Sequence, residues 1–450
     1  MADQSLRGSA ESVYGVHVPG STTSSRGETG ASSAPLRRKL CTRCARKGPG
    51  RAAPPRSRYA RAMRVLFTCS GGSGHLEPLV PLATAARGAG HTVAIAPRPW
   101  MVPRAQEFGF EAHPAGSDEG LAPVTRPLLE VDMEREFRDL RDGFGRRLSR
   151  SRAADLQPIC EAWRPDVVVW EETDFGAAVV AEKLGLPHAS VLVTAAGSFV
   201  RPDVMAEALD EVRAEYGLAP DPEAAMLSRH LVLSPFPPSF RDPRYPPAPS
   251  TRGIRTWNVR PDPGSAGSPA PPDWTARLTG APAVYFTLGT VFNHESGDLF
   301  ERVLAGVREL PINLLVTVGH EIDPATLGRQ PDHVAIERFV PQAEVLPHVD
   351  LIVSHGGSGS ILGALAHGLP MVLLPMGADQ PLNADRAAAV GVARVLDVIR
   401  STPADVRDAA AAVLADGRYR AAAGQLRDEI AALPDPSVAV GLLERLVTGR

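Results

Sequence analysis

The chain has 450 residues, enough for two or three domains, and its 44% hydrophobic and 22% charged content is ordinary for a globular protein. A net charge of −3 and an aromatic content of 5% argue against nucleic acid or a membrane surface as a partner. No apolar run is long enough to predict a membrane span, and the four cysteines suggest no disulfide framework. These features together predict a cytoplasmic protein.

Residues 1–62 are predicted to form a disordered extension. They are rich in Ser, Gly and Arg, as in "STTSSRGETGASSAPLRRKL", and contain too little apolar surface to offset the entropy of ordering. The first convincing strand follows Met63, so Met63 is also a candidate for the functional start. Cys41 and Cys44 have zinc-like spacing, but no second pair of ligands follows, and we expect no metal there.

From residue 63 the chain alternates short apolar runs with helical segments. Continuous Val, Ile and Leu runs predict parallel strands that are buried on both faces, and hence a doubly wound α/β domain over 63–260. The expected strands are 64–70, 91–97, 165–171 and 187–193, and the expected helices include 76–90 and 175–184.

The run "PDPGSAGSPAPPD" at 261–273 predicts an interdomain linker, because it is rich in Pro, Gly and Ser without periodicity. The same strand–helix rhythm restarts over 274–435. The strands expected there are 283–289, 313–319, 334–340, 351–356 and 371–376. Two Rossmann-like domains facing a cleft are predicted, with ligands beyond the carboxyl ends of the strands.

One such strand end carries the run "HGGSGS" from His355 to Ser360, just before a predicted helix. The N-terminus of a helix exposes unpaired N–H groups and the positive end of its dipole, and glycines let a phosphate approach closely. Ser358 and Ser360 add hydroxyl groups. The pattern therefore favours a phosphate site, and the alternative is a tight turn with a serine N-cap.

Other polar and aromatic residues follow neighbouring strands. Asp379 and Gln380 offer acceptors and donors suited to sugar hydroxyls, or they are an N-cap and a solvated neighbour. Phe339 could stack on a base or pack in the core, and Gln342 could read base edges.

These runs resemble the donor-binding signature of family 1 glycosyltransferases, which have the GT-B fold, and in particular the bacterial branch that glycosylates macrolides and other antibiotics. The matching motifs are Phe339-Val340-Pro-Gln342, the run from His355 to Ser360, and Asp379-Gln380. The N-terminal run "SGGSGHLEPLVPLA" also resembles the Gly-His-x-x-Pro loop of this family. The resemblance covers about residues 63–445.

The resemblance implies a donor site for a nucleotide diphosphate sugar. Its residues would be Thr290, Phe339, Val340, Gln342, His355, Gly357, Ser358, Gly359, Ser360, Asp379 and Gln380. The diphosphate would lie on His355 and the run that follows it, with Thr290 also reaching a phosphate. Phe339 stands where the family usually has tryptophan. Gly363 stands where many relatives that use uridine donors have a glutamate, so a dTDP-sugar is favoured over a UDP-sugar.

His75 follows the first strand and its Gly-rich loop. Histidine has a pKa suited to removing a proton near neutral pH, although a lone histidine at a helix start is often a polar cap. The family implies that His75 is the general base. Glu171, at the end of the strand 165–171, is the expected carboxylate partner, with Glu172 and Asp174 as alternatives. All three acids could instead simply favour the N-terminus of the next helix.

The reaction that the resemblance implies is an inverting transfer to a hydroxyl of a small natural-product aglycone. No D-x-D motif occurs, so neither a metal nor another cofactor is expected. The aglycone would lie against 98–160 and 195–250. Amphipathic patterns predict helices over 404–416, 418–432 and 437–447, and in the GT-B fold the final segment, 436–450, crosses back to the first domain.

Three other functions compete with this one. A dinucleotide-dependent oxidoreductase is disfavoured, because Glu77 replaces the third glycine of the fingerprint and the second strand ends without an acid. A non-catalytic partner of such a transferase would be expected to lose His75 or the Asp379-Gln380 pair. A sugar-nucleotide epimerase of similar fold stays open. The sequence does not indicate the oligomeric state.

Overall fold

The computed structural model describes residues 61–118, 127–246, 257–258, 274–275, 280–289 and 292–449. Nearly all of the predicted extension at 1–62, the predicted linker at 261–273 and the predicted phosphate contact Thr290 lie outside the described residues.

The first half builds a seven-stranded parallel sheet in the order β3-β2-β1-β4-β5-β6-β7. The strands are β1 (Arg64–Thr68), β2 (Thr92–Ala96), β3 (Glu111–Ala112), β4 (Val167–Glu171), β5 (His188–Val191), β6 (Leu231–Ser234) and β7 (Trp257–Asn258). Strand β1 is central, and its Val65 pairs with Val93 on one side and Val167 on the other. β-Branched residues at these positions suit a sheet that is covered on both faces.

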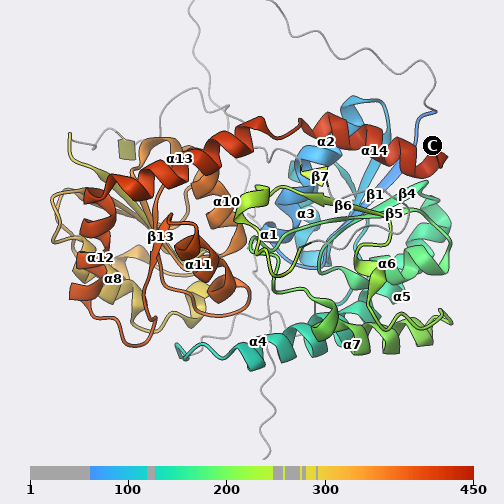
Figure 1. The fold of residues 1–450 in the computed structure, drawn as a ribbon, viewed down its shortest axis with the longest axis horizontal. Coiled ribbons are helices and arrows are strands. Elements are labelled where there is room, and N and C mark those ends of the chain that lie inside the picture. The colour runs from blue at the N-terminus through green and yellow to red at the C-terminus, as the bar shows by residue number, and fades with distance from the viewer. Residues whose placement is uncertain are drawn as a thin grey trace, which may run out of the picture.

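Helices cover both faces of this sheet (Figure 1). They are α1 (Ser73–Leu76), α2 (Val80–Gly88), α3 (Val102–Glu107), α4 (Met133–Asp139), α5 (Ser149–Trp163), α6 (Phe175–Lys183) and α7 (Pro202–Glu215), with 3₁₀ turns at Glu77–Leu79, Pro99–Met101, Ala225–Leu227 and Pro238–Phe240. The helix expected over 76–90 begins earlier, at Ser73. His75 therefore lies inside the first helical turn rather than before it.

A nine-residue π-helix, η3 (Leu140–Leu148), joins α4 directly to α5. The glycines of its "DGFG" run make close packing possible. A Cβ atom at Gly145 would lie 2.7 Å from the Cε of Met205 and 3.3 Å from the Cβ of Ala208 in α7. The region 98–160, against which the aglycone was expected to lie, thus contains a long helical segment along the lower edge of the molecule (Figure 1).

The second half builds a six-stranded parallel sheet in the order β10-β9-β8-β11-β12-β13. Its strands are β8 (Ala283–Thr287), β9 (Asn313–Thr317), β10 (Val334–Glu337), β11 (Leu351–Ser354), β12 (Met371–Leu373) and β13 (Ala393–Val395). Its helices are α8 (Leu299–Val307), α9 (Gln342–Val345), α10 (Ser358–His367), α11 (Gln380–Ala389), α12 (Pro403–Ala415) and α13 (Gly417–Ala432), with 3₁₀ turns at Phe292–Glu295, Pro324–Leu327 and Leu346–His348. None of the helices in the described ranges is both long and apolar enough to cross a membrane.

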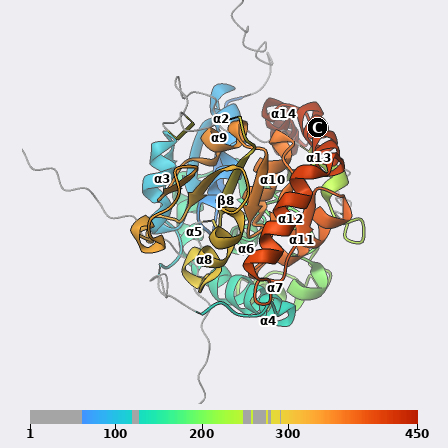
Figure 2. The same ribbon diagram turned by 90° about the vertical axis from the view of Figure 1, so that its left-hand side faces the viewer.

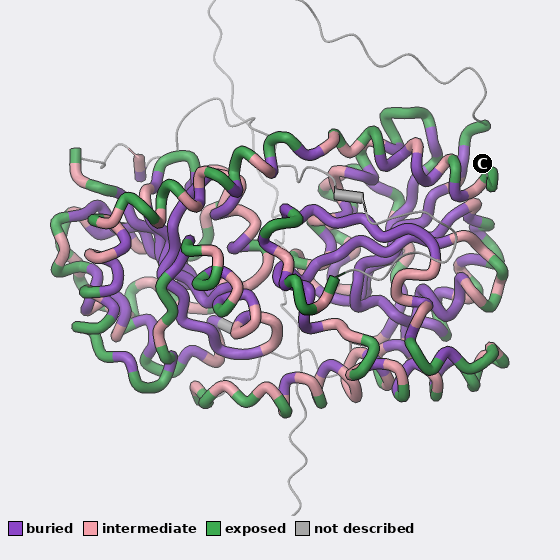
Figure 3. Tube along the Cα trace, in the orientation of Figure 1, coloured by how far each residue is buried: buried purple, intermediate pink, exposed green. Residues whose placement is uncertain are grey.

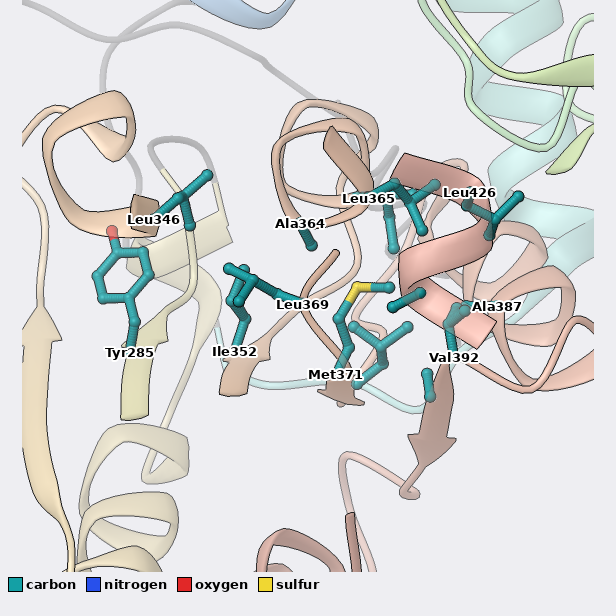
Figure 4. Close-up of a cluster of buried hydrophobic side chains, with 14 of the residues drawn as sticks. Tyr285, Leu346, Ile352, Ala364, Leu365, Leu369, Met371, Ala387, Val392 and Leu426 are labelled. Atoms are coloured by element: carbon teal, nitrogen blue, oxygen red, sulfur yellow. The ribbon is translucent and has the colours of Figure 1, made fainter. Parts of the chain in front are cut away.

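Each sheet is buried on both faces, as the purple strands of Figure 3 show. Val65 and Phe67 of β1 contribute to the apolar cluster on one face, and Leu66 contributes to the cluster on the other. In the second half, one cluster forms around Tyr285, Leu346 and neighbouring side chains between β8, β11 and α10 (Figure 4). Burying these continuous apolar runs is what holds each doubly wound sheet together.

The last helix, α14 (Pro436–Thr448), packs on the first domain. Ala439, Leu443 and other residues of α14 belong to the apolar cluster of β1 and α2. His91 ties this helix to the first strand, because its Nδ1 accepts from the Met63 N–H at 3.1 Å and its Nε2 lies 3.4 Å from Glu444. Figures 1 and 2 show α13 on the second domain and α14 on the first, so the chain passes between the domains a second time there.

Candidate active site

His75 and Glu171 form an ion pair where β1 and β4 end side by side. The Nδ1 atom of His75 lies 3.2 Å from Oε2 of Glu171, which is fully buried, whereas the His75 side chain is 27% exposed. A Cβ atom at Gly71 would lie 2.2 Å from Cδ2 of the His75 ring. The glycine therefore makes room for the ring beside the strand end.

The Glu171 carboxylate is held by groups that the sequence interpretation did not single out. Its Oε1 accepts from the Ser70 N–H at 3.0 Å and the Ser70 hydroxyl at 2.6 Å, and its Oε2 accepts from the Thr173 N–H at 2.8 Å. Burial alone raises the pKa of Glu171, but His75 and these hydrogen bonds outweigh it and lower the pKa to about 2. Glu171 is thus a fixed negative charge.

The pKa of His75 is raised above its usual value. Burial lowers it, but the charge of Glu171 and its hydrogen bond outweigh burial, and Asp379 and Asp174 add to the effect. Asp379 belongs to the second domain, so the His75 ring lies within electrostatic reach of the facing domain.

The two alternative acids are engaged elsewhere. Glu172 accepts from the N–H groups of Val193 and Thr194, at 3.0 and 2.9 Å. Asp174 forms a fully buried ion pair with Arg152, at 3.0 and 2.5 Å, and does not cap helix α6 with its side chain. Of the three acids, Glu171 is the one that contacts His75.

Phe144, which lies in the π-helix η3, stacks on the His75 ring. The ring centroids are 6.3 Å apart and the planes differ by 10°. π-Helical segments frequently occur at functional sites. No sequence signal pointed to Phe144, because a π-helix breaks the helical periodicity that would have placed its side chain.

His355 lies between two glycines at the end of β11. A Cβ atom would lie 2.5 Å from its Nε2 at Gly357 and 2.7 Å from its Cε1 at Gly289, whose φ is +75°. Burial lowers the pKa of His355 to about 4, against a hydrogen bond with the Thr287 backbone. The ring is therefore neutral near pH 7 and suited to donating a hydrogen bond rather than to supplying a positive charge.

Helix α10 begins at Ser358, after the turn that follows His355. Its N-cap is Gly357 and makes no side-chain capping bond, so the alternative of a serine N-cap is wrong. Apart from its chain neighbours and its own helical backbone, no atom of the described residues lies within 4 Å of the position that a Cβ would take at Gly359. The first turn of α10 is thus open to an approaching group, as the predicted phosphate site requires. Ser360 accepts a 3.1 Å hydrogen bond from the Gln342 amide.

Ser358, Asp379 and Asn383 form one hydrogen-bonded cluster. The Ser358 hydroxyl donates to Asp379 at 2.5 Å, and Asn383 Nδ2 donates to Asp379 at 2.8 Å. The first domain joins it, because the N–H groups of Ala195 and Ala196 donate to Ser358 Oγ and Asn383 Oδ1, at 2.6 and 2.9 Å. The cluster links the predicted phosphate and sugar residues to the domain interface.

Gln380 is only 2% exposed, and its amide oxygen accepts from the Met376 N–H at 2.9 Å. The alternative of a solvated neighbour is therefore wrong, and Gln380 shapes the loop that presents Asp379. Because this loop carries the predicted sugar contacts Asp379 and Gln380, we call residues 376–380 the sugar loop. Burial raises the pKa of Asp379, although Ser358 and Asn383 donate hydrogen bonds to it.

Phe339 is 47% exposed, so the alternative of core packing is wrong. Its ring stacks on that of His320, with centroids 4.7 Å apart and planes 23° from parallel. Val340 instead packs against the apolar cluster of the second domain. The exposed Phe339 ring suits the predicted stacking role.

Gly363 lies beside Leu346, which belongs to the apolar cluster shown in Figure 4. A Cβ atom at Gly363 would lie 2.8 Å from Cδ1 of Leu346 and 3.5 Å from Oε1 of Gln342. A larger side chain at 363 therefore requires Leu346 to move.

Two Rossmann-like domains that meet at their strand ends make up a GT-B fold. The solved structure of the spinosyn rhamnosyltransferase SpnG agrees: it is 28% identical, has a TM-score of 0.69, and the match covers 85% of this chain and all of that one.

The chain belongs to the erythromycin biosynthesis protein CIII-like family. Residues 84–289 match its N-terminal domain and residues 301–446 its C-terminal domain. The 10-deoxymethynolide desosaminyltransferase of Streptomyces venezuelae is 30% identical over 425 residues, which cover 85% of this chain and 97% of that protein. The 4'-demethylrebeccamycin synthase of Lentzea aerocolonigenes is 31% identical over 441 residues, which cover 85% of this chain and 99% of that protein. The predicted fold, family and enzyme class are confirmed.

Proposed function

We propose that this enzyme transfers a sugar from a dTDP-sugar to a hydroxyl of a small natural-product aglycone, with inversion at the anomeric carbon. The observation that carries the proposal is the His75–Glu171 pair, in which a partly exposed base is joined to a buried carboxylate at 3.2 Å. The pair lies within electrostatic reach of Asp379 on the opposite domain.

In the proposed step, His75 removes the proton of the acceptor hydroxyl. Because Nδ1 of His75 faces Glu171, Nε2 is the atom that takes this proton. The acceptor oxygen forms a bond to the anomeric carbon as the bond from that carbon to the diphosphate breaks on the opposite face. Glu171 stabilises the imidazolium that results.

The leaving diphosphate would be stabilised by the N-terminus of α10 and by a hydrogen bond from His355. The open space beside Gly359 supports this, because phosphate oxygens bind backbone N–H groups where no side chain blocks their approach. Fixed dipoles of this kind stabilise a developing charge without reorganisation, and we propose that no metal is required. Turnover that is unchanged by EDTA would support this, and turnover that is restored only by added Mg²⁺ would contradict it.

The preference for thymidine follows from Gly363 and Leu346. Glycine at 363 offers no carboxylate to a ribose hydroxyl, and a side chain there would require Leu346 to move, because its Cδ1 lies 2.8 Å from the position of a Cβ atom. Two solved relatives, both 28% identical, are consistent with this preference. VinC was solved in complex with dTDP, and SpnG was solved in complex with thymidine diphosphate.

The acceptor would bind beside His75, against the aromatic side chains of the first domain. Phe144 stacks on His75, and Phe137 stacks on Phe199 with ring centroids 5.7 Å apart. Phe199 belongs to one apolar cluster of the first domain, and the other two phenylalanines pack against that cluster. An apolar, hydroxylated aglycone suits this surface. SpnG was also solved in complex with the spinosyn aglycone.

The test is to incubate the purified full-length enzyme with a panel of hydroxylated aglycones and with dTDP- and UDP-sugars. Mass spectrometry should detect a glycoside, and the proton coupling at its anomeric carbon should show inversion. A changed donor sugar without any acceptor would indicate an epimerase. Turnover that appears only when a second transferase is added would indicate an auxiliary subunit.

A further inference from the structure

Glu136 reaches from the first domain into the second. It lies in α4, at the lower edge of both domains in Figure 1, and its Oε2 accepts a hydrogen bond from the Ala378 N–H at 2.7 Å. Glu136 is 6% exposed, so this contact is shielded from solvent. A buried carboxylate from one domain thus binds the backbone of the sugar loop of the other.

The backbone at this contact is strained. Ala378 has a φ of +52°, in the left-handed region that non-glycine residues avoid. Such a conformation persists only where its surroundings impose it. At the preceding residue, Gly377, a Cβ atom would lie 3.1 Å from Oε2 of Glu136 and 3.2 Å from Oε1. The loop therefore fits closely around the carboxylate.

Apolar contacts reinforce this arrangement. Ala378 and Leu382 belong to the second domain in sequence, yet they pack against the apolar cluster of the first domain. Met133 and Phe137 of α4 pack against the same cluster. The sugar loop is thus formed from one domain and held in place by the other.

Arg135 fixes the orientation of the Glu136 carboxylate. Its Nε and Nη2 donate to Oε1 of Glu136, at 3.2 and 2.9 Å. Oε2 is therefore directed at the Ala378 N–H. Two acceptor oxygens are required for this geometry, and a glutamine at 136 could not supply both.

We propose that Glu136 is a positioning residue for the donor sugar: it holds Gly377 and Ala378 in the strained conformation that presents Asp379 to that sugar. This inference rests on the proposed function, since it takes a nucleotide sugar as the donor. The nucleoside diphosphate part would bind at α10 and should not depend on Glu136. The binding site for the sugar part is complete only when α4 is docked on the sugar loop.

The experiment compares Glu136→Ala, Glu136→Gln and the matched control Glu134→Ala, an exposed residue on the same helix. Calorimetry of the full-length enzyme measures binding of dTDP and of a dTDP-sugar without acceptor. For Glu136→Ala we expect the dTDP-sugar to bind about tenfold more weakly, as for a lost hydrogen bond to a charged group, with dTDP affinity unchanged. The dTDP-sugar affinity of Glu136→Gln should lie between those of Glu136→Ala and the wild type, and Glu134→Ala should bind both ligands as the wild type does.

A second variant separates positioning from general stability. Ala378→Gly adopts a positive φ without strain, so we expect it to restore part of the dTDP-sugar affinity when combined with Glu136→Ala. Equal losses for dTDP and the dTDP-sugar, or no recovery with Ala378→Gly, would overturn the inference. Failure of the wild-type enzyme to bind dTDP or UDP would instead count against the proposed function.

Discussion

The ends of β1 and β11 are built alike and yet place their histidines in opposite electrostatic states. Each strand is central in its sheet and runs into a Gly-rich turn and a helix start, with a histidine close by. His75 is 27% exposed beside the Glu171 carboxylate, and its pKa is raised. His355 is buried, and burial outweighs its hydrogen bond with the Thr287 backbone and lowers its pKa to about 4.

The difference shows that the surroundings of the histidine, and not the glycine-rich motif beside it, decide whether the ring is favoured in its protonated or its neutral form. A fixed negative charge on the neighbouring strand β4 favours the protonated form of His75, which suits a residue that takes up a proton. Burial favours the neutral form of His355, which suits a residue that binds a diphosphate through a hydrogen bond. The four predictions that follow alter one side of this comparison at a time.

The largest effect is expected for His75→Ala. Removing the base should lower kcat on the order of 100-fold or more. Binding of the nucleotide sugar, measured by calorimetry, should be retained because the proposed donor site lies on the other domain. Near-normal turnover would remove His75 as the base.

His355→Ala should weaken nucleotide binding rather than the proton-transfer step. We expect dTDP to bind about tenfold more weakly, the effect of losing one hydrogen bond to a charged group. Because the His355 pKa is about 4, dTDP affinity of the wild-type enzyme should gain nothing from His355 protonation between pH 6 and 8. A His355-dependent increase in affinity towards pH 6 would contradict the neutral ring.

Glu171→Gln should move the pH profile. His75 must be neutral to act as a base, and Glu171 raises its pKa, so the acid limb of kcat/KM in the wild type should lie above the usual histidine value of 6.5. Without that charge, burial dominates and the limb should shift to lower pH, while the maximal rate falls because the imidazolium loses its counter-charge. Glu161→Gln, an exposed residue on α5, is the control. An unmoved acid limb would show that Glu171 does not act on the base.

The smallest effect concerns nucleotide choice at α10. Gly363→Glu alone should weaken binding of both nucleotides because of the contact with Leu346. Combined with Leu346→Ala, the new carboxylate has room to accept from a ribose hydroxyl, and UDP should gain about two- to tenfold relative to dTDP. Leu346→Ala alone is the control. An unchanged UDP-to-dTDP ratio in the double variant would remove 363 as the selectivity position.

The fold was largely predictable because parallel strands buried on both faces are continuous apolar runs, as in "RVLFT" and "DVVVW". Every strand that was expected is present, and the three last helices agree with expectation to within a residue or two. Strands β3, β6, β7 and β13 were not expected, and they extend the edges of the two sheets. The expected helix start near residue 76 was wrong by a few residues. "SGHL" carries no apolar periodicity of its own, and a short helix of this kind forms because the strand before it and α2 after it fix its ends.

The site was predictable where residues adjoin a strand end, as with His75, Glu171 and the run after β11. The contacts that join distant segments were not. Phe144 reaches His75 through a π-helix, and Glu136 reaches Ala378 across 242 positions of sequence. The Phe144 contact lies within the first domain and depends on how η3 packs there, whereas the Glu136 contact depends on how the two domains dock. No local sequence pattern encodes either arrangement.

The chain crosses from the second domain to the first between α13 and α14. If the domains open about this crossing, displacement should grow with distance from it. In Figure 1, α4 lies across the molecule from α13 and α14, so the Glu136 contact is far from this crossing. A small rotation about the crossing would therefore produce a large displacement at this contact.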